Sequence, residues 1–247
     1  MRNLIASSFC AAALSALSAL SALSAVSALS ACSGAQEIPP DARTTVVSLQ
    51  KIDCAECGEE ILSDLRQRPG VYSAKFDKRR AEIVVIASPS FDVLGTVKQL
   101  SANEGFEAVL GAGQGSYLEG AKFPEGADVQ TVAQDGADVP SLDPYLARGK
   151  VTVVDFSAEW CMPCRKLDEH MVKVLAGRRD VAYRKFDIGD WDTPLAQRYL
   201  KDVPQLPYVI VYGANGARVD AIAGVETTRL DKAIQRGAGA APAPASP

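Results

Sequence analysis

The sequence predicts two small domains that combine helices and strands, an α+β domain followed by an α/β domain, behind an export segment. Three observations lead to this fold class. Residues 1–31 are almost free of charge, two later stretches show alternating strand and helix patterns, and a Gly-rich stretch at 111–120 lies between those two. A chain of 247 residues is long enough for two modest domains once an export segment is set aside.

The N-terminal segment 1–31 carries the marks of export and lipid attachment. It starts with Arg2, contains no other charge, and is long enough to span a bilayer, for which about 20 apolar residues suffice. It ends in Leu29-Ser30-Ala31-Cys32, and small residues before a cysteine resemble the lipobox of bacterial lipoproteins. We therefore expect a lipoprotein signal peptide over 1–31, lipidation of Cys32 and a polar tether over 32–43. A retained membrane anchor and ordinary cleavage are the alternatives.

The resemblance to lipoproteins implies a location in the cell envelope, with a lipid anchor in the membrane and the chain facing the periplasm. Ser33, where inner-membrane lipoproteins of enteric bacteria have Asp, favours the outer membrane. The chain has 26 Lys and Arg against 30 Asp and Glu, a net charge of −4. Nucleic-acid binding requires concentrated positive charge, so we expect no nucleic-acid partner.

The first patterned stretch, 44–111, predicts a β-α-β-β-α-β order. Ile61, Leu62 and Leu65 share one face of a helix that Pro69-Gly70 terminates. Two strand-like runs then flank a charged turn, which indicates a hairpin. This order is a ferredoxin-like plan. The expected elements are strand 44–49, helix 59–68, strands 71–77 and 81–87, helix 90–104 and strand 105–110.

A linker is expected at 112–122 and a second domain at 123–236. Residues 151–156 form a nearly continuous apolar run, as expected of a central strand buried on both faces. The pattern around 134–136 suggests an entry hairpin. The tail 237–247 is rich in Ala, Pro and Gly and is expected to be disordered. The other expected elements are strands 128–133, 138–139, 182–188, 208–212 and 218–223, a helix after Cys161, and helices 193–199 and 228–236.

The cysteines are arranged in pairs. Of the six, one lies in the signal segment and one is Cys32, and the others form Cys54/Cys57 and Cys161/Cys164. An exported protein that keeps its cysteines in C-x-x-C pairs uses them for redox or metal chemistry rather than as scattered structural links. A shared zinc site is disfavoured, because the gap between the pairs far exceeds the roughly 15–20 residues of a zinc ribbon.

The second pair, in Cys161-Met162-Pro163-Cys164, follows the predicted buried strand and opens a helix. The attacking species in disulfide exchange is the thiolate, and a helix N-terminus stabilises negative charge. Cys161 is therefore expected to be the nucleophile. Cys164, one turn further on, is placed to resolve the mixed disulfide by attacking it from within. A stable structural disulfide is the alternative.

Residues 154–164, VDFSAEWCMPC, resemble the active-site segment of the thioredoxin family, and the resemblance covers roughly 125–236. It implies a thioredoxin-like fold in which Trp160 shields the disulfide. Asp155 matches the buried carboxylate that exchanges a proton with Cys164, and burial is expected to raise its pKa. Lys185 matches a lysine that often neighbours that carboxylate.

The same resemblance implies a place for the substrate. Pro207 stands just before a predicted strand and matches the family's cis-proline, whose loop would lie against Cys161 and receive the substrate chain. The implied partners are protein disulfides and an upstream membrane thiol–disulfide electron donor. Met162 and Ser157 depart from thioredoxin proper, so the reducing or oxidising direction stays open. The continuation 165–169 resembles periplasmic reductant pathways more than strong oxidants.

The first pair, in Ile52-Asp53-Cys54-Ala55-Glu56-Cys57, resembles the heavy-metal-associated domain family, and the match spans about 44–111. In that family two cysteines hold a soft ion at a loop leading into a helix, which implies a site for Cu(I), Hg(II) or Zn(II) at Cys54 and Cys57. Asp53 and Glu56 add negative charge, which should raise the thiol pKa values and favour a more highly charged ion. A redox-active dithiol without metal and a degenerate docking module are the alternatives.

The sequence thus predicts a membrane-anchored, periplasm-facing protein disulfide reductase that needs no cofactor for its redox chemistry and carries a soft-metal-binding module. The alternative is a copper or mercury carrier in which the C-terminal domain only keeps Cys54 and Cys57 reduced.

Overall fold

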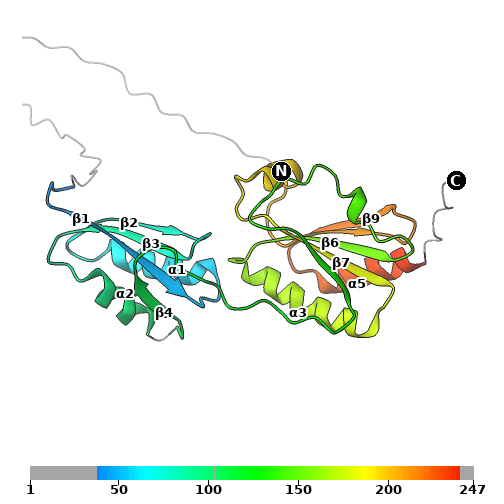
Figure 1. Cartoon of the computed structure of the whole chain (residues 1–247), viewed down its shortest axis with the longest axis horizontal. Coiled ribbons are helices and arrows are strands. Elements are labelled where there is room, and N and C mark those ends of the chain that lie inside the picture. The colour runs from blue at the N-terminus through cyan, green and yellow to red at the C-terminus, as the bar shows by residue number, and fades with distance from the viewer. Residues whose placement is uncertain (1–37, 103, 240–247) are drawn as a thin grey trace, which may run out of the picture. The chain divides into compact units, whose positions relative to one another are not determined.

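The computed structural model describes residues 38–102 and 104–239 (Figure 1). The predicted signal peptide, the lipidation site Cys32, the first half of the tether and the last eight residues of the C-terminal tail lie outside these residues. The described part belongs to one compact unit, Glu37–Pro247. No helix within this part is both long and apolar enough to cross a membrane.

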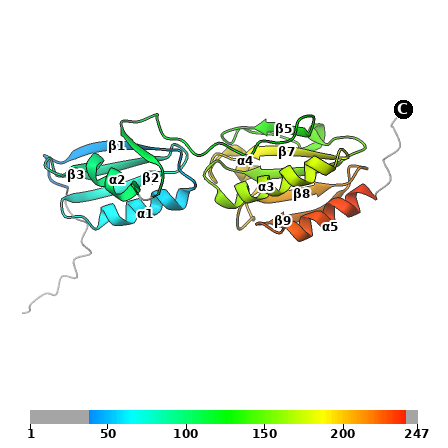
Figure 2. The ribbon, with the colours of Figure 1, turned by 90° about the horizontal axis from the view of Figure 1, so that it is seen from below.

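The N-terminal domain has the predicted β-α-β-β-α-β order, so the ferredoxin-like plan is confirmed. Its strands form a four-stranded sheet in the order β2-β3-β1-β4, in which every neighbouring pair is antiparallel. The two helices lie on the same face of this sheet (Figure 2). The elements are β1 (Arg43–Gln50), α1 (Ala55–Arg66), β2 (Val71–Asp77), β3 (Glu82–Ala87), α2 (Val93–Ser101) and β4 (Glu107–Leu110).

The core of this domain follows from the two periodicities in its sequence. Alternate residues of β3 are fully buried, as expected of a strand with one covered face. Leu62 and Leu65 of α1 are buried against that face. At Gly58 a Cβ atom would come within 2.3 Å of the Phe76 ring on β2. Helix α1 therefore reaches its observed position over the sheet because residue 58 has no side chain.

The C-terminal domain contains a five-stranded sheet in the order β5-β7-β6-β8-β9. Strands β5, β7 and β6 are parallel, whereas β8 and β9 run antiparallel to their neighbours. Helices α3 and α5 lie on one face of this sheet (Figure 2). The elements are β5 (Asp128–Ala133), the 3-10 helix η1 (Asp143–Tyr145), β6 (Val151–Ser157), α3 (Met162–Gly177), β7 (Val181–Asp187), α4 (Pro194–Tyr199), β8 (Tyr208–Tyr212), β9 (Arg218–Ala223) and α5 (Thr227–Ala238).

Strand β6 is the central strand that its apolar run predicts, and every residue in it is buried. Val153 packs in the cluster formed with α3 and α5, whereas Val154 and Phe156 pack in the cluster that includes α4. Because side chains alternate along a strand, Asp155 lies on the same face as Val153. Its carboxyl group therefore faces α3, the helix that begins after Cys161.

The predicted entry hairpin around 134–136 is wrong. Strand β5 does not fold back onto 138–139, which is not a strand, and it pairs in parallel with β7. A turn is present, since Asp135 and Gly136 both have positive φ. Two amide groups of this turn donate hydrogen bonds to Asp187. The Gly136 N–H donates to the Asp187 carbonyl at 3.0 Å, and the Asp135 N–H donates to the Asp187 carboxylate at 2.9 Å. The turn signal in the sequence was correct, but the partner strand was not.

The expected linker at 112–122 differs from a free tether along part of its length. The Ser116 N–H donates to the Leu49 carbonyl at 2.9 Å, and the Leu118 N–H donates to the Ile52 carbonyl at 3.0 Å. These bonds hold the middle of the segment beside the end of β1. Its Gly-rich composition indicates irregular backbone, but composition does not reveal which backbone groups will pair with it.

Candidate active site

Cys161 and Cys164 form a disulfide at the N-terminus of α3. Cys161 is the extended residue that caps the helix, and its Sγ accepts a hydrogen bond from the Cys164 N–H at 3.1 Å. The two side chains are only 4% and 3% exposed. A sulfur that receives a helix amide is well placed to hold negative charge once the disulfide is reduced. The geometry therefore suits Cys161 to the predicted role of nucleophile.

Trp160 is fixed beside the disulfide rather than free in solvent. Its indole N–H donates to the Gly189 carbonyl at 2.6 Å, in the loop that follows β7. Its ring packs in the same apolar cluster as Cys161 and Cys164. Its role in shielding the disulfide stays a prediction.

Asp155 is completely buried behind the disulfide on β6. Its Oδ2 accepts a hydrogen bond from the Tyr183 hydroxyl at 2.8 Å, and its Oδ1 has no partner among the described residues. Burial raises the pKa of Asp155 to about 7, and the negative charge of Asp168 adds to this rise. Lys185, Tyr183 and Ser157 act on this pKa in the opposite direction. A carboxyl group that titrates near neutral pH can both take up and return a proton.

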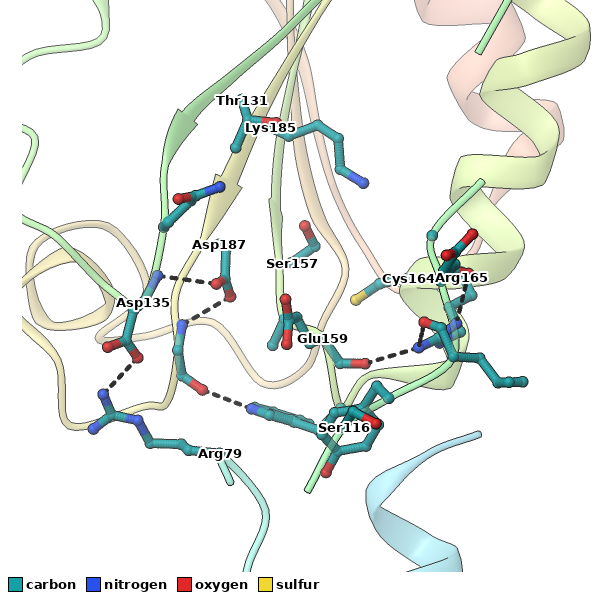
Figure 3. A pocket seen from close by; sticks show the side chains of 18 of the residues that line it. Arg79, Ser116, Thr131, Asp135, Ser157, Glu159, Cys164, Arg165, Lys185 and Asp187 are labelled. Atoms are coloured by element: carbon teal, nitrogen blue, oxygen red, sulfur yellow. Dashed lines mark hydrogen bonds and ion pairs between the residues drawn. The ribbon is translucent and has the colours of Figure 1, made fainter. Parts of the chain in front are cut away.

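Lys185 lies on β7 and points into the pocket that Cys164 and Ser157 also line (Figure 3). The resemblance predicts that this lysine neighbours Asp155. The pairing of β6 with β7 places Lys185 directly opposite Asp155, as predicted, and its ammonium group pairs with the Asp168 carboxylate, with 2.5 Å between Nζ and Oδ2. The positive charge still lowers the pKa of Asp155, but the direct contact is with a different acid.

Two residues that the sequence analysis did not assign to the site, Asp168 and Tyr183, therefore belong to it. Asp168 lies one helical turn after Cys164 on α3, and Tyr183 precedes Lys185 by two positions on β7. These spacings place each of them on the same face as a predicted site residue. That placement was the available signal, because a charged side chain on the inward face of a helix requires a partner.

Pro207 precedes β8, and the Leu206–Pro207 peptide bond is cis, in agreement with the match to the family's cis-proline. Leu206 is buried in the same cluster as Cys161 and Cys164. The loop before β8 and the disulfide thus share one apolar environment. Its predicted role in receiving the substrate chain stays a prediction.

Cys54 and Cys57 are free thiols at the start of α1, with 3.4 Å between their sulfur atoms. Cys54 is buried and Cys57 is half-buried. Burial raises the pKa of Cys54 to about 12, and Glu56 and Cys57 also act upward. Glu56 therefore raises the pKa of the Cys54 thiol, as expected from its charge, although burial causes the larger part of the rise. Within residues 38–102 and 104–239, no group of three or more His, Cys, Asp or Glu side chains is arranged to hold a metal ion.

Comparisons with known proteins assign the C-terminal domain to the family that its active-site segment resembles. The family model described as Thioredoxin matches residues 141–236. Thioredoxin-2 of Saccharomyces cerevisiae is 33% identical over 93 residues, which are 37% of this chain and 86% of that protein. Mitochondrial thioredoxin-3 of the same yeast is 32% identical over 83 residues, or 34% of this chain and 62% of that protein. The oxidised crystal structure of yeast mitochondrial thioredoxin 3 has 28% identity and a TM-score of 0.30, and the match covers 36% of this chain and 79% of that chain.

A disulfide at the start of a helix, beside a buried carboxyl group and a cis-proline, defines a dithiol–disulfide redox domain. The chain belongs to the thioredoxin family. It spans only 56% to 64% of the length of three relatives, yeast mitochondrial thioredoxin-3, thioredoxin H8 of Arabidopsis thaliana and thioredoxin H2-1 of Oryza sativa. No heavy-metal-associated family model matches the chain, so that resemblance stays a prediction for the N-terminal domain.

Proposed function

We propose that the whole protein is a thiol–disulfide oxidoreductase that acts on protein disulfides, held in the cell envelope by a lipid on Cys32 and facing the periplasm. The observation that carries the activity is the Cys161–Cys164 disulfide at the N-terminus of α3, with Asp155 buried on the adjoining strand. The anchor and the location are supported by the sequence of residues 1–33 alone.

In the reducing direction, the Cys161 thiolate attacks one sulfur of the substrate disulfide. A Cys161–substrate disulfide forms, the substrate S–S bond breaks, and the first substrate sulfur leaves as a thiolate. Cys164 then passes its proton to the Asp155 carboxylate and attacks the Cys161 sulfur. The mixed disulfide breaks, the second substrate thiolate leaves, and Cys161–Cys164 is oxidised by two electrons.

An upstream membrane dithiol would return those two electrons and regenerate the reduced pair. The same steps run backwards in an oxidase, so the direction depends on the reduction potential. A redox titration of Cys161/Cys164 in the purified protein measures that potential. A value near about −270 mV identifies a reductant of the thioredoxin type, and one near about −120 mV an oxidant. We expect the lower value, and the higher one would contradict the proposed direction.

The N-terminal dithiol is proposed to bind a soft metal ion. Two sulfur atoms 3.4 Å apart form a compact pair of soft ligands. A structural zinc site takes four protein ligands, whereas this pair supplies two, so the donor set fits Cu(I) or Hg(II) better than Zn(II). The thiol of Cys54 has a raised pKa, so a metal ion must displace its proton to bind. Cys54 and Cys57 would hold the ion, which is a cargo rather than part of the redox reaction.

Contacts within the compact unit connect this dithiol to the redox centre. The Ala55 N–H, next to Cys54, donates to the carbonyl of Trp160, next to Cys161, at 3.1 Å. The Lys78 ammonium lies 4.2 Å from the centre of the Trp160 ring. These contacts support the proposal that Cys161 and Cys164 keep Cys54 and Cys57 reduced within one molecule. Two electrons and two protons would pass from the C-terminal dithiol to a Cys54–Cys57 disulfide.

This transfer is tested with protein in which both pairs are oxidised and electrons are supplied to the C-terminal domain. Alkylation and mass spectrometry then follow the thiols of Cys54 and Cys57. We expect the rate at which these thiols recover to be independent of protein concentration. The two domains belong to one chain, so each is present near the other at an effective concentration of roughly millimolar. Cys161→Ser should abolish it. If the thiols recover no faster than when the two domains are mixed as separate chains, the transfer within one molecule is disproved.

The second candidate function, a copper or mercury carrier, is supported by the same paired thiols. The two functions differ in which cysteines are essential. For an oxidoreductase, Cys161→Ser abolishes the reduction of foreign disulfides, whereas Cys54→Ser/Cys57→Ser leaves it intact. For a carrier, loss of Cys54 and Cys57 reproduces the full phenotype of deleting the gene. Measuring both variants therefore separates the two.

A further inference from the structure

Asp155 is one end of a chain of polar groups that leads out of the core. The Tyr183 hydroxyl lies 2.8 Å from Oδ2 of Asp155 and 2.9 Å from Oδ1 of Asp168. Oδ2 of Asp168 in turn pairs with the Lys185 ammonium. Asp155 and Tyr183 are fully buried, whereas Asp168 and Lys185 line the pocket beside Cys164. Lys185 and Cys164 are labelled in Figure 3. The series therefore runs from the interior to an opening next to the redox centre.

The number of hydrogen atoms in this series is fixed by its geometry. A tyrosine hydroxyl has one hydrogen, so it can donate to only one of the two carboxyl groups. Its distances to both are nevertheless those of hydrogen bonds. The second contact is a hydrogen bond only if the other carboxyl group is protonated and donates to the tyrosine oxygen. The arrangement thus holds one proton in addition to the hydroxyl hydrogen.

That additional proton belongs on Asp155 rather than on Asp168. The Lys185 ammonium pairs with Asp168 and not with Asp155. Burial and the charge of Asp168 both raise the pKa of Asp155, to about 7. The Asp155 carboxyl then donates to Tyr183, and Tyr183 donates to Asp168. Each hydrogen bond points outward, towards the pocket.

The surroundings leave few other routes for this proton. The charged and titratable groups that act on Asp155 are Tyr183 and Lys185 from β7 and Asp168 from α3, with the Ser157 hydroxyl on its own strand. On the opposite side, β8 places Val209 next to Asp155. The Phe123 ring packs edge-on against the Tyr183 ring, with 5.5 Å between centroids. The hydroxyl of Tyr183 is consequently enclosed, except for its two carboxyl partners.

We propose that Tyr183 and Asp168 are positioning residues that relay the proton between Asp155 and the pocket during disulfide exchange. Before Cys164 attacks the mixed disulfide, Asp155 gives its proton to the Tyr183 oxygen, while the Tyr183 hydroxyl gives its own to Asp168. Two O–H bonds form and two break. Asp168 releases the proton into the pocket, where the departing substrate thiolate takes it up. When Cys164 attacks, its S–H bond breaks and its proton passes to the ionised Asp155 carboxylate.

This relay deepens the proposed oxidoreductase function and rests on it. It predicts that Tyr183 and Asp168 affect the second step, the attack by Cys164, and not the first step, the attack by Cys161. In a background of Cys54→Ser/Cys57→Ser only the C-terminal thiols react. A chromogenic aromatic thiol is attached to Cys161 at low pH, the pH is raised, and the absorbance of the released thiol reports the second step.

Tyr183→Phe and Asp168→Asn should each lower the rate of release by roughly tenfold or more below the midpoint of the pH profile, where Asp155 holds a proton at rest; a directly positioned acid or base contributes roughly 10²–10⁴-fold. The plateau at high pH, where Asp155 is already ionised, should stay unchanged. Removal of the Asp168 charge should also lower the midpoint, because that charge raises the pKa of Asp155. The alkylation rate of Cys161 should stay unchanged in both.

Tyr199→Phe is the matched control, because its hydroxyl donates to the Val139 carbonyl and has no link to Asp155. It should keep the profile of the unaltered protein. A rate below the midpoint that is unchanged in either Tyr183→Phe or Asp168→Asn would overturn the relay, even if the midpoint moves. Failure of Cys161 in the unaltered protein to form the mixed disulfide would instead refute the oxidoreductase function itself.

A measurement on the unaltered protein tests the relay even if a variant does not fold. Carbon-13 NMR follows the carboxyl carbon of Asp155 through a pH titration. The relay requires Asp155 to hold a proton at rest, so its midpoint should lie at about 7. A midpoint at the ordinary pKa of aspartate would overturn the proposal.

Discussion

Asp155→Asn provides a quantitative test of the buried carboxyl group. Asparagine keeps the size of the side chain and still accepts a hydrogen bond from Tyr183, but it cannot ionise. An acid whose pKa rises on folding binds more protons in the native state, so its favourable contribution is complete below the unfolded-state pKa. That contribution is lost as the pH rises through the folded-state pKa. For Asp155 this window runs from 3.8 to about 7.

The size of the effect follows from this window. The shift is about three pKa units, and each unit corresponds to about 1.4 kcal/mol. Ionised Asp155 therefore destabilises the oxidised protein by on the order of 4 kcal/mol above pH 7 or so. The free energy of unfolding of Asp155→Asn should exceed that of the unaltered protein by a margin that grows by about this amount between about pH 4 and about pH 8.

Denaturant unfolding of the oxidised protein, followed by tryptophan fluorescence, measures this margin. The chain has two tryptophans, Trp160 and Trp191, and both lie in the C-terminal domain, so the signal reports that domain alone. Asp138→Asn is a control of opposite sign, because the Arg198 guanidinium lowers the pKa of Asp138. At pH values above the ordinary pKa of aspartate, Asp138→Asn should be less stable than the unaltered protein. A margin for Asp155→Asn that does not change with pH would refute the argument that native Asp155 is an acid with a raised pKa.

Three further predictions concern the cysteines. Cys161→Ser should eliminate disulfide reduction and Cys164→Ser should trap mixed disulfides, because the resolving thiol is gone; insulin reduction at the normal rate by Cys161→Ser would contradict the assignment. Cys32→Ala should release the protein from membranes, and continued membrane fractionation of that variant, with Cys32 unmodified in mass spectra of the unaltered protein, would contradict the lipid anchor. The affinity of Cys54 and Cys57 for Cu(I) should fall steeply with falling pH, because protons compete with the ion. Chelator competition at two pH values measures this, and equal affinities would contradict binding by these thiols.

The local part of the fold was predictable because it depends on periodicity and on short-range signals. The apolar run of β6 identifies a strand buried on both faces, whatever lies next to it. The Cys161–Cys164 spacing after that strand predicts a helix with one cysteine at its N-terminus. The hairpin expected around 134–136 shows the limit of such signals. A turn can be seen in the sequence, but the strand with which β5 pairs lies some fifty residues away.

By itself the sequence determined the order of the elements in the N-terminal domain, the two C-x-x-C pairs and the position of Asp155 behind one of them, because each follows from residues close together in the chain. Only the tertiary structure decided that Lys185 pairs with Asp168 and that Tyr183 joins Asp168 to Asp155. The two contacts of Asp168 depend on how far α3 lies above the sheet and on its rotation about its own axis. Both are set by the packing of all the side chains between helix and sheet, which no local pattern contains.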